Sequence, residues 1–141
     1  MEKRAIIWLK IGFMFGAIVD ALALMPMLIP RVSKMFWGIE NFTGIYYFAQ
    51  GMGAALMLGW TSLLLWAFQQ PLQRRFVAVL TIVVIIGIVI TQIFAIRMDY
   101  IEFSRLIGSF VLQAVLLAVF GYGFIVSHSP HANPGDAEYR I

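Results

Sequence analysis

Four long runs of apolar residues alternate along the chain with short segments that hold most of the charges and prolines. The last three runs contain no charged residue, and the first is interrupted only by Lys10 and Asp20. A hydrocarbon core of about 30 Å needs roughly 20 helical residues. Backbone groups in lipid must be hydrogen-bonded internally, and these runs do not alternate as barrel strands would. The pattern therefore predicts four membrane-spanning helices, at residues 5–29, 45–68, 76–96 and 106–126.

The predicted fold is all-α, an integral membrane four-helix bundle over residues 1–126 with both termini on the same side. Residues 127–141 contain Pro130, Pro134 and Gly135 and are expected to form a flexible polar tail. Six of the ten Lys and Arg residues would lie on the side of the termini. This excess favours cytoplasmic termini in a bacterial inner membrane. The alternative is a signal peptide cleaved after Ala23, but the apolar run continues past that point.

The segment between the first two runs has features of its own. Pro26 and Pro30 are expected to end or kink the first span. Residues 31–38 alternate basic and apolar side chains. We expect them to form a short turn that lies flat on the outer membrane surface.

Composition excludes several classes of protein. The chain is 62% hydrophobic and 12% charged, whereas a soluble domain carries about 25% charged residues. A soluble, disordered or nucleic-acid-binding protein is therefore excluded, and the lipid bilayer is the first expected partner. There is no cysteine, so disulfides, thiol nucleophiles and Cys-ligated metals are excluded. The only histidines are His128 and His131 in the tail, and we expect no metal and no cofactor.

Asp20 is the only acidic residue inside a predicted span. A carboxyl group in hydrocarbon is costly and marks a functional hypothesis by default. Gly12, Gly16 and Asp20 recur every fourth residue, so they share one helix face on which small residues allow close approach. Asp20 is therefore expected to face protein. It is either a carboxylate that binds a proton or a cation, or a structural acid hydrogen-bonded to a facing helix.

Each of the other three spans contains one glutamine. At a helical rise of about 1.5 Å per residue, these glutamines and Asp20 all fall in the outer half of the membrane. This predicts a polar layer inside the bundle that binds a small ligand or lines an ion path. Ordinary interhelical hydrogen bonding, worth about 0.6 kcal/mol per contact, is the alternative. The candidates are Asp20, Gln50, Gln92 and Gln113, with Thr91, Tyr46 and Tyr47 at nearby depths.

Two further patterns have simpler interpretations. Gly51, Ala55 and Gly59 form a second stripe of small residues, which predicts contact within the bundle or in a dimer. Asp99 and Glu102 are three residues apart in the loop at 97–105. A solvated loop with internal ion pairs explains them better than a catalytic carboxylate pair, which would need a pocket.

The four-span layout is similar to that of small bacterial membrane proteins of the DoxX-like kind. It also resembles small multidrug-resistance-type transporters, which carry a carboxylate in the first of their four spans. This chain has Asp20 where those transporters have glutamate, and the flanking residues differ. The resemblance is one of architecture.

Three functions follow from these features. The first is a structural, accessory or subunit role, with a homodimer or a larger membrane protein as the partner. The second is a small oligomeric transporter or channel in which Asp20 couples proton or cation binding. The third is an enzyme acting on a lipid or a quinone. No nucleophile–base pair is evident in the sequence, so an enzyme is the least expected of the three.

Overall fold

The computed structural model describes residues 2–38 and 42–127, and these residues are all-helical outside short connections. Four of the helices are long and apolar enough to cross a membrane, as the sequence predicted. The helices in these two stretches are α1 (Glu2–Leu28), α2 (Pro30–Trp37), α3 (Gly44–Gln69), α4 (Phe76–Arg97) and α5 (Phe103–Ser127). The tail at 128–141, with its two histidines, lies outside the described residues.

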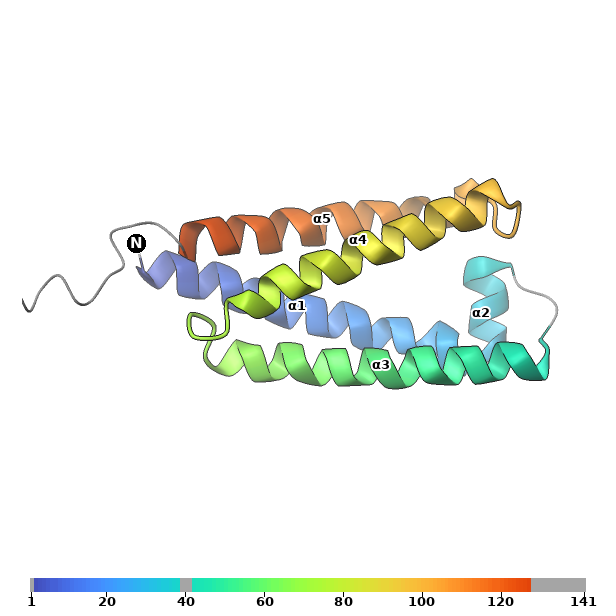
Figure 1. The fold of residues 1–141 in the computed structure, drawn as a ribbon, viewed down its shortest axis with the longest axis horizontal. Coiled ribbons are helices and arrows are strands. Elements are labelled where there is room, and N and C mark those ends of the chain that lie inside the picture. The colour runs from blue at the N-terminus through green and yellow to red at the C-terminus, as the bar shows by residue number, and fades with distance from the viewer. Residues whose placement is uncertain (1, 39–41, 128–141) are drawn as a thin grey trace, which may run out of the picture.

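The start of α1 and the end of α5 lie at the same end of the molecule (Figure 1). We call this the terminal end, and the opposite end, which carries α2, the α2 end. The four long helices run up and down between these two ends. Both described ends of the chain are therefore on one side, as an even number of spans requires.

The break between α1 and α2 agrees with an end of the first span near Pro30 and corrects the turn expected at residues 31–38. α1 continues through Pro26 and ends at Leu28. Ile29 is extended, and Pro30 begins α2 at a first-turn position where its missing N–H group costs nothing. α2 is a helix of 8 residues rather than a turn, and it ends at Gly38, whose φ is 71°. A left-handed residue of this kind is the usual C-terminal cap of a helix, and glycine adopts it without strain.

Helix α1 is the central element, since it packs against α3 on one side and α5 on the other. The glycines of α1 make this packing close. A Cβ added at Gly16 would lie 3.0 Å from Phe120 of α5 and 3.2 Å from Leu64 of α3. Gly12 meets the same Phe120 ring at 3.3 Å. Helix α4 packs mainly on α5.

The core lies toward the terminal end. In α1 its members are Leu9, Phe13 and Ala17, and they meet Leu64 and Ala67 of α3 together with residues of α4 and α5. The buried residues of α4 are confined to its first half, Val77, Ala78, Thr81 and Ile85. Beyond the core, α4 and α5 diverge from α1 and α3, and α2 lies crosswise between the two pairs (Figure 1). The α2 end is therefore less tightly packed than the terminal end.

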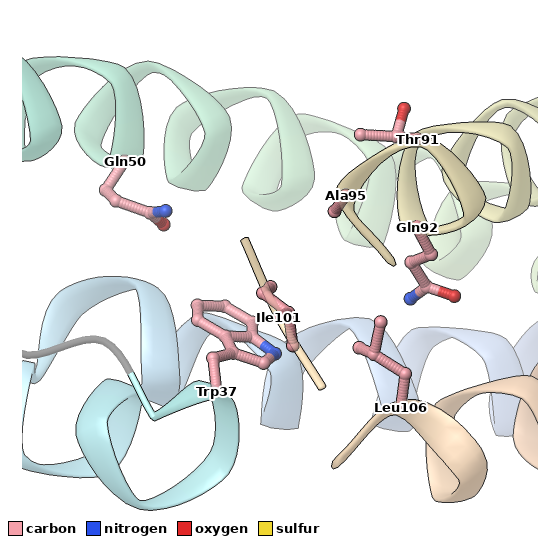
Figure 2. Close-up of a pocket in the computed structure, with 7 residues that line it drawn as sticks. All are labelled: Trp37, Gln50, Thr91, Gln92, Ala95, Ile101 and Leu106. Atoms are coloured by element: carbon pink, nitrogen blue, oxygen red, sulfur yellow. The ribbon is translucent and has the colours of Figure 1, made fainter. Parts of the chain in front are cut away.

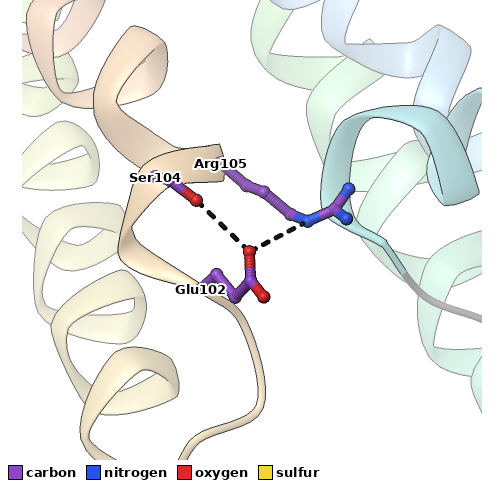
Figure 3. Close-up of polar contacts among 3 residues, drawn as sticks. All are labelled: Glu102, Ser104 and Arg105. Atoms are coloured by element: carbon purple, nitrogen blue, oxygen red, sulfur yellow. Dashed lines mark hydrogen bonds and ion pairs between the residues drawn. The ribbon is translucent and has the colours of Figure 1, made fainter.

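Polar contacts attach α2 and the loop before α5 to the rest of the fold. The hydroxyl of Ser33, which is fully buried, forms a hydrogen bond of 2.6 Å with the hydroxyl of Tyr46 in α3. Arg105 lies over Gly38, because a Cβ at that glycine would be 2.8 Å from the guanidinium carbon. Glu102 pairs with Arg105 at 3.8 Å and accepts from Ser104 at 3.3 Å (Figure 3). Glu102 thus has local partners, in keeping with a solvated loop.

Candidate functional site

A pocket of about 210 Å³ lies at the α2 end. It is bounded by α2, α3 and α4, by the loop before α5, and by the first turns of α5 itself (Figure 2). Two of the predicted glutamines and the predicted threonine line it. Its residues are Trp37, Gln50, Thr91, Gln92, Ala95, Ile101 and Leu106.

The two glutamines at this pocket carry buried oxygens without a hydrogen-bond partner in the described part of the chain. These atoms are Gln50 Oε1 and Gln92 Oε1. Figure 2 shows the Gln50 amide pointing from α3 into the space beside Trp37, and the Gln92 amide pointing toward Leu106. A buried amide oxygen without a hydrogen bond costs about 1–3 kcal/mol. The lining of the pocket is mainly apolar, so these two amides are the groups that a hydrogen-bond donor in the pocket would use.

Ser109 joins two of the predicted glutamines. Gln92 Nε2 of α4 donates to Ser109 Oγ at 2.8 Å, and Gln113 Nε2 donates to the same oxygen at 3.2 Å. Gln113 is 7% exposed, and its Oε1 also lacks a partner in residues 2–38 and 42–127. Sequence reasoning missed Ser109. Its position four residues before Gln113 on the same helix face was the available signal.

The sequence-predicted hydroxyl groups have more ordinary surroundings. Thr91 lines the pocket, but its hydroxyl donates to the backbone oxygen of Gly87 at 3.0 Å in its own helix. The Tyr46 hydroxyl is bonded to Ser33 and so connects α3 to α2. Tyr47 is 52% exposed and does not line the pocket. Of these three residues, only Thr91 borders the pocket.

Asp20 is half-buried on α1 and does not line the pocket. It makes no hydrogen bond or ion pair with another residue of the described stretches. Its depth follows from the packing of its neighbours. Gly16 of α1 lies against Leu64 of α3, and the two helices run in opposite directions (Figure 1). One turn further along α1, Asp20 is therefore level with Trp60, one turn back along α3.

The contact between Gly12 and α5 shows in the same way which residues of α5 are level with Asp20. Gly12 of α1 lies against Phe120 of the antiparallel α5. Two turns further along α1, Asp20 is level with the region of Gln113. Trp60 Nε1 is another buried polar atom without a partner in the described residues. One depth of the bundle thus holds a carboxyl group, an indole N–H and an amide oxygen, each without a described hydrogen bond.

The two predicted stripes of small residues face different surroundings. Gly12 of α1 is buried against α5, and Gly16 is buried between α3 and α5. Gly51 and Gly59 on α3 have open space where a Cβ would be, and Ala55 between them is exposed. This second stripe therefore points away from the other described helices. Of its two predicted roles, contact with a second molecule is the one that the geometry allows.

No protein-family model, curated protein or solved structure matches the chain. Within the described residues, no group of three or more His, Cys, Asp and Glu side chains is arranged to hold a metal ion. What the site can do must be argued from its own groups.

Proposed function

We propose that this chain is a small multi-pass membrane protein that binds a cation, either a monovalent metal ion or a protonated amine, in the α2 half of its bundle. One observation carries the proposal. The carboxamide oxygens of Gln50, Gln92 and Gln113 are buried and lack a hydrogen-bond partner in residues 2–38 and 42–127. Amide and carboxylate oxygens are the ligands that hard cations prefer.

The charges of the spans support a cation over an anion. Asp20 is level with Trp60 and Gln113, and no Lys or Arg belongs to the predicted spans at 45–68, 76–96 and 106–126. The other charged group of the first predicted span, Lys10, lies on the terminal side of the core residue Phe13. A half-buried carboxylate needs a positive partner or a proton. A cation bound at the depth of Asp20 meets this need and would also satisfy the oxygen of Gln113.

The aromatic residue at the pocket favours a protonated amine among the cations. The indole of Trp37 borders the pocket beside Gln50. The face of a Trp ring attracts ammonium groups by about 0.5–2 kcal/mol. A small ammonium ion would use the ring face and the amide oxygens together.

Cation movement across the membrane would make the chain a small transporter or channel. Four helices enclose so little volume that such a transporter would have to be an oligomer.

The orientation is part of this proposal. The first turns of α1 carry Lys3 and Arg4, and the loop between α3 and α4 carries Arg74 and Arg75. An excess of basic residues at one end favours its placement in the cytoplasm of a bacterial cell. The cation pocket would then be on the outer side.

The test is cation-dependent stabilisation of the purified full chain in detergent. Sodium, potassium and tetramethylammonium chlorides are compared at equal ionic strength, and the melting temperature is the readout. We expect at least one of these cations to raise the melting temperature of the wild type and of Asp99→Asn, a control carboxylate in a loop. Asp20→Asn and Gln113→Leu should lose that increase. If Asp20→Asn responds to each salt as the wild type does, the proposal is wrong.

A second candidate function, a subunit or accessory role, rests on the exposed stripe of Gly51, Ala55 and Gly59. Small residues at this spacing let a second helix approach closely in lipid. Since the chain has no cysteine, Ala55→Cys introduces a single thiol for cross-linking in native membranes. This role predicts a cross-linked product at position 55 and none for Ala118→Cys, an exposed position on α5. Equal yields at both positions would contradict it.

A further inference from the structure

A second pocket lies at the terminal end, where α1 meets the loop between α3 and α4. Its volume is about 280 Å³. One cation, three side-chain amides and three apolar residues line it, and none of the lining residues is acidic. They are Ile6, Lys10, Gln69, Gln70, Pro71, Leu72 and Gln73.

Lys10 is the only charged residue among those that line this pocket. Its Nζ lies 5.3 Å from the centre of the Phe68 ring. No carboxylate in residues 2–38 and 42–127 pairs with it, because the ion pair found in those residues joins Arg105 to Glu102 at the other end. The positive charge of Lys10 therefore has an aromatic neighbour but no anionic partner in the described structure.

The two arginines of the adjacent loop are already engaged. Arg74 donates to the backbone oxygen of Trp66, and its guanidinium carbon lies 3.6 Å from the centre of the Trp66 ring. Arg75 donates to the backbone oxygen of Ser127 at 3.0 Å. These contacts hold the loop between α3 and α5. Of these three cations, Lys10 is the one that lines the pocket.

Aromatic side chains near this pocket are of the kind found at the membrane–water interface. Trp8 lies two residues before Lys10 and makes an edge contact with Tyr122, with the ring centres 5.1 Å apart. Trp66 lies on α3 within one turn of Gln69, and both Trp8 and Trp66 are partly exposed. Tryptophan and tyrosine gather where acyl chains meet headgroups. We therefore expect the pocket to lie at the depth of lipid phosphates.

We propose that this terminal-end pocket binds a phosphate-bearing anion, with Lys10 as its charge partner and the amides of Gln69, Gln70 and Gln73 as hydrogen-bond donors. Anionic phospholipid headgroups and free phosphate share this chemistry. Basic pockets between spans at a membrane interface are typical sites for anionic headgroups. Ile6 and Leu72 add apolar lining that suits the glycerol and acyl part of a lipid. This site is independent of the cation pocket at the α2 end.

The test measures stabilisation of the full chain in detergent micelles by three probes: phosphatidylglycerol, phosphatidylcholine and inorganic phosphate. We expect phosphatidylglycerol to raise the melting temperature of the wild type more than phosphatidylcholine does. Lys10→Gln should weaken the apparent affinity for phosphatidylglycerol by about fivefold or more. Lys3→Gln is the matched control, because Lys3 is exposed on the same helix and does not line the pocket.

The outcomes separate the two sources of phosphate. A Lys10-dependent shift with phosphatidylglycerol alone assigns the site to a lipid. An equal shift with inorganic phosphate, also lost in Lys10→Gln, assigns it to a soluble anion. If Lys10→Gln is poorly folded, Lys10→Arg and Gln70→Leu replace it, and we expect the first to keep the shift and the second to reduce it. Equal stabilisation by both lipids, or a full shift in Lys10→Gln, would overturn the proposal.

Discussion

The side-chain amide of Gln92 donates a hydrogen bond of 2.8 Å to the hydroxyl oxygen of Ser109, and this contact joins α4 to α5. The Gln113 amide donates to the same oxygen. The buried residues of α4 lie toward its other end, so this polar contact holds the two helices where apolar packing is sparse. It also orients the Gln92 oxygen that lacks a described partner at the pocket.

Replacement of Ser109 by alanine should therefore destabilise the bundle. Ser109→Ala leaves two amide N–H groups without their acceptor, and we expect a loss of about 1–2 kcal/mol in the free energy of unfolding. The measurement is reversible unfolding of the purified chain in mixed micelles. Ser62→Ala is the control, since the exposed Ser62 hydroxyl donates only to the backbone of its own helix. Equal losses in both variants would show that the Ser109 contact does not hold α4 to α5.

The close contact at Gly16 predicts a strong size dependence. A methyl group there would lie 3.0 Å from Phe120 and 3.2 Å from Leu64, so Gly16→Ala must push two core side chains aside. We expect a destabilisation of about 1–3 kcal/mol. Gly59→Ala meets open space and should leave the free energy of unfolding unchanged or slightly higher. The measurement is the melting temperature of the two variants. An unchanged melting temperature for Gly16→Ala would mean that α1 can shift away from α5.

Gly38 has a backbone conformation that disfavours any other residue. Its φ of 71° is a conformation that other residues adopt at a cost of about 1–2 kcal/mol. An added Cβ would also lie 2.8 Å from the guanidinium of Arg105, so this partly exposed side chain would have to move aside. Gly38→Ala should therefore lower the melting temperature and loosen the α2 end. Gly44→Ala, where nothing lies within 4 Å, is the control, and equal melting temperatures for the two variants would argue against this packing.

The Ser33–Tyr46 hydrogen bond predicts a difference between two adjacent tyrosines. Tyr46→Phe removes the partner of the buried Ser33 hydroxyl, and we expect a loss of about 0.5–1.5 kcal/mol. Tyr47→Phe should have almost no effect, because Tyr47 is largely exposed. Proteolysis of the segment that precedes α3 offers a second readout. Faster cleavage in Tyr46→Phe than in Tyr47→Phe is expected if the bond fixes α2.

The membrane-spanning elements could be predicted closely, because lipid leaves the backbone few choices. A run of apolar residues long enough to cross must be helical, and the predicted span at 76–96 corresponds to α4 at Phe76–Arg97. The segment after the first span is polar, so the need to hydrogen-bond the backbone in lipid does not determine its structure. The sequence predicted a turn at residues 31–38. The structure has a helix there, α2, which begins at Pro30 and is capped by Gly38.

The candidate site was only partly predictable. Counting residues along each span predicted that Gln50 and Gln92 lie at similar depth, and both line one pocket. The count could not show that Gln92 and Gln113 would share Ser109, nor that Asp20 would stand outside that pocket. Depth follows from the helical rise, but direction within the bundle depends on how the helices pack.

The sequence by itself thus determined the number of long apolar helices and their approximate lengths, because an apolar run long enough to cross a bilayer must be helical. Only the tertiary structure decided which faces meet. Lipid and protein interior are both apolar, so a spanning helix has no hydrophobic contrast that marks its inner side. The stripe at Gly12 and Gly16 packs inward, and the similar stripe at Gly51 and Gly59 faces outward. Steric fit against particular side chains such as Phe120 made that difference.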